Sequence, residues 1–192
     1  MMKFIGALSI CLALFACIGN KDQKELIEGI KIGNIAPELS YPSVNGDTLK
    51  LSSLRGSVVL IDFWASWCRP CRWENRNLIQ TVKTFENKDF PNGKNWIGQS
   101  VTSKGLKVFS VSLDQNKASW ERAIKQDKLD WIWHISDLKG WRSDPAKIYS
   151  VSSIPTNFLI DANGIIIGIN LRGNSLDQAL EKHSIKTKGE EK

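Results

Sequence analysis

The stretch Val58–Cys71, which reads VVLIDFWASWCRPC, joins a long apolar run to two cysteines. An apolar, β-branched run without polar alternation predicts a strand that is buried on both faces. Beyond it, Leu78, Val82 and Phe85 recur at helical spacing, so the stretch leads directly into a helix. The unpaired N–H groups at a helix start favour a thiolate, and thiol pKa values of about 3.5–7.5 occur in such Cys-x-x-Cys sites. The sequence therefore predicts a redox-active dithiol between a strand and a helix.

The two cysteines are expected to differ in role because they differ in depth. Cys68 lies at the exposed start of the predicted helix and is the expected nucleophile, whereas Cys71 lies one turn further in. In thiol–disulfide exchange, the first thiolate forms a mixed disulfide with the substrate and the second thiol resolves it. Arg69 adds a positive charge beside Cys68, which favours the thiolate form.

Two other uses of the cysteine pair were weighed against exchange. A Cys-x-x-Cys pair is also half of a zinc site, but the mature chain offers only His134 and His183 as further ligands, and these are far apart in sequence. A purely structural disulfide is disfavoured because so small a loop constrains the unfolded chain little. We therefore expect neither a metal nor another cofactor.

Composition and charge narrow the class of protein. The chain has 192 residues, of which 42% are apolar and eight are Trp, and this suits a single domain with a sizeable core. Its formal charge of +6 comes from Lys and Arg residues that are scattered and interleaved with acids. Because there is no basic stripe with interleaved aromatic residues, nucleic-acid binding is not expected.

Residues 1–16 have the features of a signal peptide, with a basic start and an apolar run that ends at Ala16. The run is too short to cross a bilayer. Its last residues, Leu-Phe-Ala before Cys17, resemble a bacterial lipobox, which predicts that Cys17 is acylated and anchors the protein to a membrane. Ordinary cleavage after Ala16 is the alternative. Residues 17–31 are polar and charged and would form a tether.

The lipobox interpretation leaves only two free thiols in the mature protein. Cys11 leaves with the signal peptide and Cys17 carries lipid, so Cys68 and Cys71 remain. Export places them in a compartment where disulfides form and persist. The sequence thus indicates a lipid-anchored protein of the cell envelope with its domain in the periplasm, on either membrane.

Residues 32–185 are expected to form one domain in which strands and helices alternate before a closing hairpin and helix. This order predicts an α/β sandwich with a central sheet covered on both faces. Residues 88–105 are expected to form a mobile surface insertion, and residues 186–192 a frayed tail. The other expected elements are a hairpin at 39–51, a strand at 106–112, a helix capped by Asn116, a short strand at 131–135, a short helix opened by Asp144, a hairpin at 156–171 and a last helix with a capping box at Ser175 and Gln178.

The residues around the cysteines resemble a known family. The string DFWASWCRPCRWE at residues 62–74 is similar to the TlpA/ResA branch of the thioredoxin superfamily, and the likeness extends over most of residues 33–184. The resemblance implies a thioredoxin-like three-layer sandwich, with a central mixed sheet and helices on both faces. It also implies two additions to that fold, an N-terminal β-hairpin and an inserted helix and strand within residues 116–135.

The resemblance also implies roles for residues outside the cysteine pair. Asp62 matches a buried acid that handles the proton of the inner cysteine, and Glu74 matches an active-site acid. Ile154 and Pro155 match a cis-proline loop whose free backbone groups pair with an extended substrate, and Trp67 is an expected substrate contact. Without the resemblance, Asp62 would be read as a backbone cap, Glu74 as a solvated helix residue and Pro155 as a trans proline that ends a loop.

The function implied by the resemblance is a membrane-tethered thiol–disulfide oxidoreductase. Its clients would be disulfide-bearing proteins of the envelope, its electrons would come from a thiol donor on the membrane side, and cytochrome c maturation is a plausible pathway. One alternative is a thioredoxin-fold binding module with a redox-inert cysteine pair. Another is a peroxiredoxin-like antioxidant, which is disfavoured because the peroxidatic pattern has a lone Cys preceded by Pro and Thr.

Overall fold

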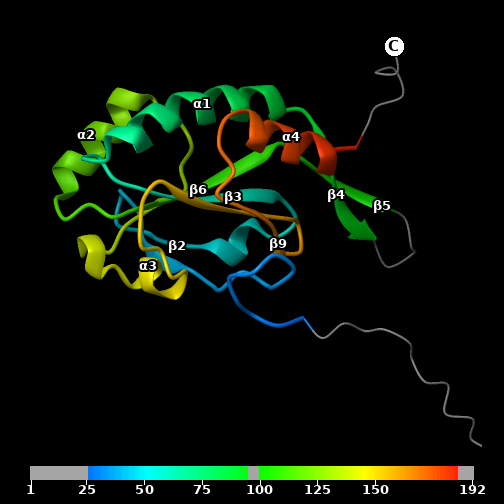
Figure 1. Cartoon of the computed structure of the whole chain (residues 1–192), viewed down its shortest axis with the longest axis horizontal. Coiled ribbons are helices and arrows are strands. Elements are labelled where there is room, and N and C mark those ends of the chain that lie inside the picture. Colours follow the sequence, from blue (N-terminus) through cyan, green and yellow to red (C-terminus); the bar gives the residue numbers. More distant parts are fainter. Residues whose placement is uncertain (1–25, 95–99, 186–192) are drawn as a thin grey trace, which may run out of the picture.

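The computed structural model describes residues 26–94 and 100–185, which form a central sheet with helices on both sides (Figure 1). The predicted signal peptide, the acylation site Cys17, most of the tether and the tail at 186–192 lie outside these residues. The described elements, in chain order, are β1 (Ser40–Pro42), β2 (Thr48–Lys50), the 3-10 helix η1 (Leu51–Leu54), β3 (Val58–Trp64), α1 (Arg69–Phe85), β4 (Asp89–Lys94), β5 (Ser100–Lys104), β6 (Leu106–Ser112), α2 (Lys117–Asp127), β7 (His134–Ile135), the 3-10 helix η2 (Gly140–Arg142), α3 (Asp144–Ile148), β8 (Thr156–Ile160), β9 (Ile166–Ile169) and α4 (Asn174–His183).

The central sheet has the strand order β7-β6-β3-β8-β9. The middle strand is β3, which runs parallel to β6 and antiparallel to β8. Every residue of β3 is buried, Asp62 included, as an apolar run without polar alternation predicts. Because β3 ends just before the cysteines, the centre of the sheet delivers the dithiol to the start of α1.

The two faces of the sheet carry separate hydrophobic clusters. Val58 and Leu60 of β3 pack with side chains of α1 and α4. Val59, Ile61 and Phe63 pack with α2, α3 and the N-terminal segment. Successive residues of a strand point to opposite faces, so β3 anchors both layers at once. The predicted three-layer sandwich is confirmed, with the N-terminal hairpin β1–β2 and the inserted α2 and β7 both present.

The prediction of a mobile surface insertion at 88–105 is wrong for the described part of this segment, which forms an antiparallel hairpin of β4 and β5. Phe90 is fully buried, and its ring lies 6.4 Å from that of Phe85 between centroids. At the base of the hairpin, Gly105 N donates to Lys88 O at 3.0 Å. One buried aromatic residue therefore fixes a segment whose Asn, Gly and Ser content is typical of a loop.

The starts of two helices also differ from the sequence prediction. The capping box proposed for the last helix is wrong, because α4 follows Gly173 and has no side-chain cap. Ser175 Oγ instead accepts from Arg172 N at 2.9 Å. The short helix α3 begins at Asp144, one residue earlier than predicted, and its cap is Ser143 instead of Asp144; Ser143 Oγ accepts from Ala146 N.

Ordered contacts begin before residue 32. Glu28 bridges to Ile35, and Gly29 N donates to Ile35 O at 3.0 Å. Ile30 packs against the core cluster, so part of the segment assigned to the tether lies on the domain. Of the helices within residues 26–94 and 100–185, not one has both the length and the apolar character needed to cross a bilayer.

Candidate active site

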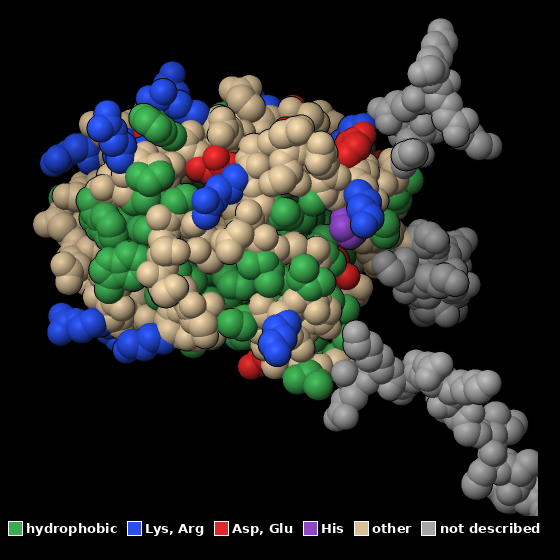
Figure 2. Space-filling model, in the orientation of Figure 1, with side chains coloured by type: hydrophobic (Ala, Val, Ile, Leu, Met, Phe, Trp, Pro, Cys, Tyr) green, Lys and Arg blue, Asp and Glu red, His purple; other side chains and the backbone are tan. Residues whose placement is uncertain are grey.

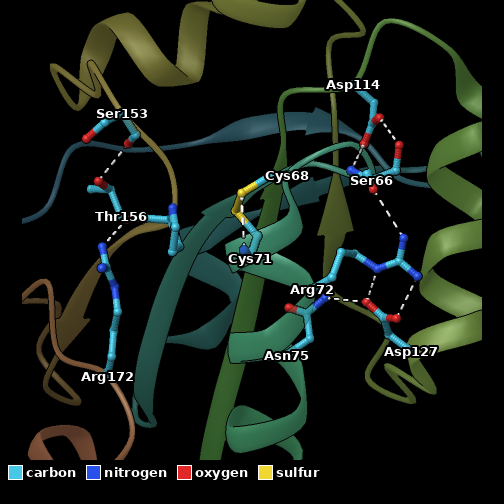
Figure 3. Close-up of a disulfide and its surroundings, with 11 residues drawn as sticks. Ser66, Cys68, Cys71, Arg72, Asn75, Asp114, Asp127, Ser153, Thr156 and Arg172 are labelled. Carbon is cyan, nitrogen blue, oxygen red and sulfur yellow. Dashed lines mark hydrogen bonds and ion pairs between the residues drawn. A yellow bond between two sulfur atoms is a disulfide. The ribbon is translucent and has the colours of Figure 1, made fainter.

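The two cysteines are joined by a disulfide at the start of α1 (Figure 3). Cys68 is the N-cap residue of α1, and its Sγ accepts a hydrogen bond from Cys71 N at 3.2 Å. The residue Cys68 is 5% exposed and Cys71 is 1% exposed. Their order of depth is as predicted, but the solvent exposure expected for Cys68 is wrong for the disulfide form, because both residues belong to the core cluster.

The substrate-binding side chains named from the sequence lie on two sides of the disulfide. The Ile154–Pro155 peptide bond is cis, which confirms the conformation that the resemblance implies. Pro155 is buried and Ile154 is half-buried. Trp67 is 54% exposed, whereas Trp64 is buried. In Figure 3 the loop around Ser153 lies on one side of the sulfurs and the turn that precedes Cys68 on the other.

Asp62 lies in the middle of the central sheet, in β3, at the register position of Asn157 in β8. It lies two residues after Leu60 in β3, so both side chains are on the same face of the sheet, the face that α1 and α4 cover. Its carboxylate accepts no hydrogen bond from the described residues, so it is not the backbone cap that the alternative required. The pKa of Asp62 is raised from 3.8 to about 7, mainly because the carboxyl is buried; the like charge of Glu74 adds to the rise and Arg172 opposes it. A carboxyl with this pKa takes up and releases a proton near neutral pH.

Glu74 is held by the start of α4 and is not a solvated helix residue. Its Oε1 accepts from Gly173 N at 2.9 Å, and its Oε2 accepts from Asn77 Nδ2 at 2.9 Å. One residue earlier, the Arg172 guanidinium donates to Pro155 O (Figure 3). The entry to α4 therefore connects an acid of α1 to the cis-proline loop.

A second buried acid, Asp114, fixes the turn that leads into the disulfide. Asp114 is 1% exposed and follows β6. Its carboxylate accepts from Ser66 N at 2.9 Å, from Ser66 Oγ, and from Ser112 Oγ at 2.7 Å. These donors offset the cost of burying the carboxylate and hold Ser66 two residues before Cys68.

Arg72 ties the same turn to the end of α2. Its guanidinium donates to both carboxylate oxygens of Asp127, with Nη2 2.7 Å from Oδ1, and its Nη1 donates to Ser66 O at 3.1 Å. Asn75 Nδ2 donates to the same carboxylate at 2.7 Å (Figure 3). A planar guanidinium that binds a carboxylate through two bonds fixes orientation as well as distance. The turn before Cys68 is thus held from the sheet and from α2.

Four residues near the disulfide received no role from the sequence. Asp114, Arg72 and Arg172 make the contacts just described, and Trp141 packs on Trp67 with ring centroids 6.1 Å apart. A signal existed for Asp114, since it follows the strand parallel to β3 and the carboxyl ends of parallel strands meet at one edge of a sheet. The positions of Arg172 and Trp141 depend on long-range packing.

The two histidines considered as zinc ligands lie in separate elements. His134 is in β7 and His183 ends α4. Within the described ranges, no three or more His, Cys, Asp or Glu side chains are grouped so as to hold a metal ion.

The chain is similar to known proteins in both sequence and structure. A family model described as Thioredoxin-like matches residues 56–166. Thiol-disulfide oxidoreductase ResA of Geobacillus kaustophilus is 27% identical over 185 residues, covering 94% of this chain and 94% of that protein. Thioredoxin-like protein YneN of Bacillus subtilis is 28% identical over 144 residues, covering 74% of this chain and 73% of that protein.

The solved structures that resemble the chain include enzymes of the same kind. A thiol-disulfide oxidoreductase from Bacteroides fragilis is 30% identical with a TM-score of 0.65. The match covers 78% of this chain and 98% of that one.

Proposed function

The chain belongs to the thioredoxin-like family and is a thiol-disulfide oxidoreductase, and on that premise we propose that it reduces disulfides in proteins of the cell envelope. The observation that carries the proposal is the cysteine pair itself. Cys68 caps α1 and is the more exposed of the two, and Cys71 is one turn deeper with its amide on the Cys68 sulfur. Cys68 therefore meets a client first, and Cys71 meets Cys68.

The exchange proceeds in two balanced steps. The Cys68 thiolate attacks one sulfur of the client disulfide, a bond forms between Cys68 Sγ and the client, and the other client sulfur leaves as a thiolate that takes a proton. Cys71, once deprotonated, attacks Cys68 Sγ, which closes the Cys68–Cys71 disulfide and releases the second client thiol. Two electrons pass to the client.

Asp62 is the proposed acceptor for the proton of Cys71. Its pKa of about 7 lets it take a proton at neutral pH, and it lies on the face of the sheet that α1 covers. Glu74 acts on this proton through Asp62, since its own oxygens are bound to Gly173 N and Asn77 Nδ2.

The cycle needs a reductant, and we propose a dithiol donor on the membrane side. That donor attacks the Cys68–Cys71 disulfide and leaves it reduced, itself becoming a disulfide. A lipid on Cys17 would hold the enzyme close to such a donor and to envelope clients. Cytochrome c maturation, in which thiols must be kept reduced, is one pathway that suits a reductant in this compartment.

A trapping experiment tests the proposed direction and the roles of the two cysteines. Cys71→Ala leaves the mixed disulfide without an intramolecular escape, so covalent client adducts accumulate on a non-reducing gel and disappear on addition of reductant. Cys68→Ala, the matched control, accumulates almost none. Equal trapping by both variants would reverse the assignment of the nucleophile. Absence of trapping in both, together with a wild-type pair that thiol reductants leave unreacted, would favour the inert binding module.

The proposed anchor has a separate test. Cys17→Ala removes the acylated residue, so the precursor should stay unacylated and lose its membrane association. The measurement is fractionation of cell envelopes after metabolic labelling with a fatty acid. A variant that is processed, labelled and fractionated like the wild type contradicts the lipoprotein assignment and leaves the exchange reaction untouched.

A further inference from the structure

Three tryptophans near the disulfide are unusually open to solvent. Trp67 is 54% exposed, Trp73 is 61% exposed and Trp141 is 50% exposed. Two of them lie on the stretch that carries the cysteines, one directly before Cys68 and one in the second turn of α1. Large aromatic side chains left in water next to a reactive group are typical of interaction surfaces.

The contact between Trp141 and Trp67 depends on the glycine that precedes Trp141. Gly140 has φ +59°, and a Cβ at that position would meet Gln115 Cγ at 2.9 Å. Only glycine therefore lets the 3-10 helix η2 approach the turn after β6 this closely. The approach brings Trp141 to Trp67, with ring centroids 6.1 Å apart and the planes tilted by 56°.

The two indoles border a groove, which we call the tryptophan groove, and one of them belongs to the residue that directly precedes Cys68. Its volume is about 390 Å³, and the residues used here are Trp67, Leu113, Gln115, Gly140, Trp141 and Arg142. Leu113 is fully buried and forms an apolar floor. The groove therefore offers aromatic walls and an apolar base, and its wall residue Trp67 is joined directly to Cys68.

The charges around the tryptophan groove are mostly positive and partly unpaired. Arg69 and Arg142 are exposed, and neither forms an ion pair with a residue in the described part of the chain. The guanidinium of Arg69 lies over the ring of Trp73, 5.6 Å from its centroid. The Asp144 carboxylate is already bound by Lys139 and Lys147. Figure 2 shows Lys and Arg side chains gathered, with hydrophobic ones between them, at the end of the molecule where α2 and α3 lie in Figure 1.

We propose that the tryptophan groove is a docking surface for an extended client segment that carries an aromatic residue and an acidic residue next to its cysteine. An aromatic side chain would pack against the exposed sides of Trp67 and Trp141, and the client carboxylate would pair with Arg142 or Arg69. The inference rests on the proposed function, which it deepens by naming the class of client. It follows from charge complementarity together with the place of Trp67, which lines the groove and directly precedes Cys68.

The test compares three synthetic peptides of equal length, each with one intramolecular disulfide. The first has Phe and Asp beside a cysteine, the second has Phe and Lys, and the third has Ser and Asp. Second-order rate constants for oxidation of the reduced protein are followed by tryptophan fluorescence at low salt. We expect the first peptide to react about tenfold faster than either of the others, and the advantage over the second to shrink as salt rises.

Variants then locate the preference on the protein. Arg142→Glu should invert the preference between the Asp and Lys peptides, and Trp141→Ala should remove the preference for Phe over Ser. Lys107→Glu, the matched charge reversal at the other end of β6, should leave both ratios at the wild-type value. The ratio of two peptide rate constants measured on the same variant is unaffected by a general loss of activity. Thermal unfolding checks that each variant folds.

Equal rates for the three peptides, or a faster reaction with the Lys peptide, would overturn the docking proposal. The proposed function would survive that result, because the wild type would still reduce the peptides and a small uncharged disulfide such as 2,2′-dithiodipyridine. If neither the peptides nor the small disulfide were reduced, the proposed function would fail, and the docking proposal with it. Ratios that change equally in Lys107→Glu and Arg142→Glu would also overturn the assignment to the groove.

Discussion

Two buried aspartates of the central sheet and its edge, Asp114 and Asp62, differ in the number of hydrogen-bond donors around their carboxylates. Asp114 accepts hydrogen bonds from Ser66 N, Ser66 Oγ and Ser112 Oγ. Asp62 accepts none from the described residues and faces the like charge of Glu74. Both are at most 5% exposed, so depth does not distinguish them. The two aspartates differ in the hydrogen-bond donors that surround each carboxylate.

The difference shows how one fold uses the same side chain for two purposes. A buried carboxylate that is fully hydrogen-bonded joins pieces of structure, here the turn before Cys68 and the end of β6. A buried carboxylate without donors is destabilised in its charged form, so its pKa rises and it exchanges a proton near neutral pH. The same conservative change, Asp to Asn, should therefore act in opposite directions at the two sites.

Asp62→Asn should give the largest effect, a gain in stability at neutral pH. The pKa of Asp62 rises from 3.8 to about 7 on folding, so the folded state keeps a proton that the unfolded state loses. Stability of the wild-type disulfide form therefore falls as pH rises from about 4 to about 7, and then levels off. At about 1.4 kcal/mol for each pH unit, the loss amounts to about 4 kcal/mol. The variant should lack this loss in denaturant unfolding measured across that range.

The same variant also tests the proposed chemistry in the reduced state. Without a proton acceptor beside Cys71, resolution of the mixed disulfide should slow, and thiol alkylation should follow a different pH curve. Retention of the wild-type alkylation curve in both Asp62→Asn and Glu74→Gln would remove the two acids from the mechanism.

Asp114→Asn should give the next largest effect, with the opposite sign. An amide nitrogen in place of one oxygen cannot accept from the donors of Ser66 and Ser112, so buried donors lose their partner. The expected loss is about 1–3 kcal/mol in the free energy of unfolding. Denaturant unfolding measures it. A loss of stability in Asp62→Asn and a gain in Asp114→Asn would invert the comparison.

Glu74→Gln should give a smaller change, confined to the titration of Asp62. The amide Oε1 still accepts from Gly173 N, so the start of α4 stays in place. Removal of the like charge lowers the pKa of Asp62, and the upper end of the stability loss moves to lower pH. The side-chain carboxyl signal in a carbon-13 NMR titration reports the shift. A shift to higher pH would contradict the assigned cause.

Arg172→Gln should give the smallest change, in the other direction. Arg172 lowers the pKa of Asp62 less than burial and Glu74 raise it, so its removal raises the pKa slightly. The same titration measures this effect, and Lys107→Gln serves as a distant control that should leave Asp62 unchanged. Equal shifts in the two variants would mean that net charge alone, and not position, sets the pKa.

Local patterns in the sequence predicted most of the fold. The apolar run into Cys68 identified β3 and α1, and the Asn163–Gly164 pair identified the hairpin of β8 and β9. Asn116 capped α2 as expected, with its Oδ1 accepting from Ser119 N at 2.9 Å. Each of these signals lies within a few residues of the structure that it specifies.

The parts that could not be predicted depend on partners far away in the chain. Ser66 and Asp114 are 48 residues apart, and Glu74 and Gly173 are 99 apart, so no local pattern joins them. The hairpin of β4 and β5 was hidden in the same way, because its loop-like composition is overridden by one aromatic residue, Phe90, that is buried in the core. Asp62 received its role only through the family resemblance, and Asp114 received none because its donor Ser66 is 48 residues away in the chain.

The contacts of Arg172 and Gly173 set the order in which the parts of the active site can assemble during synthesis. The chain is made from the N-terminus, so the strand, the cysteines and α1 emerge about 100 residues before the segment that binds Glu74 and the Pro155 carbonyl. A nascent or truncated chain that ends before residue 172 therefore carries its thiols without the clamp that joins them to the cis-proline loop. The contacts that join α1 and the cis-proline loop to the start of α4 can therefore form only after residues 172 and 173 have been made.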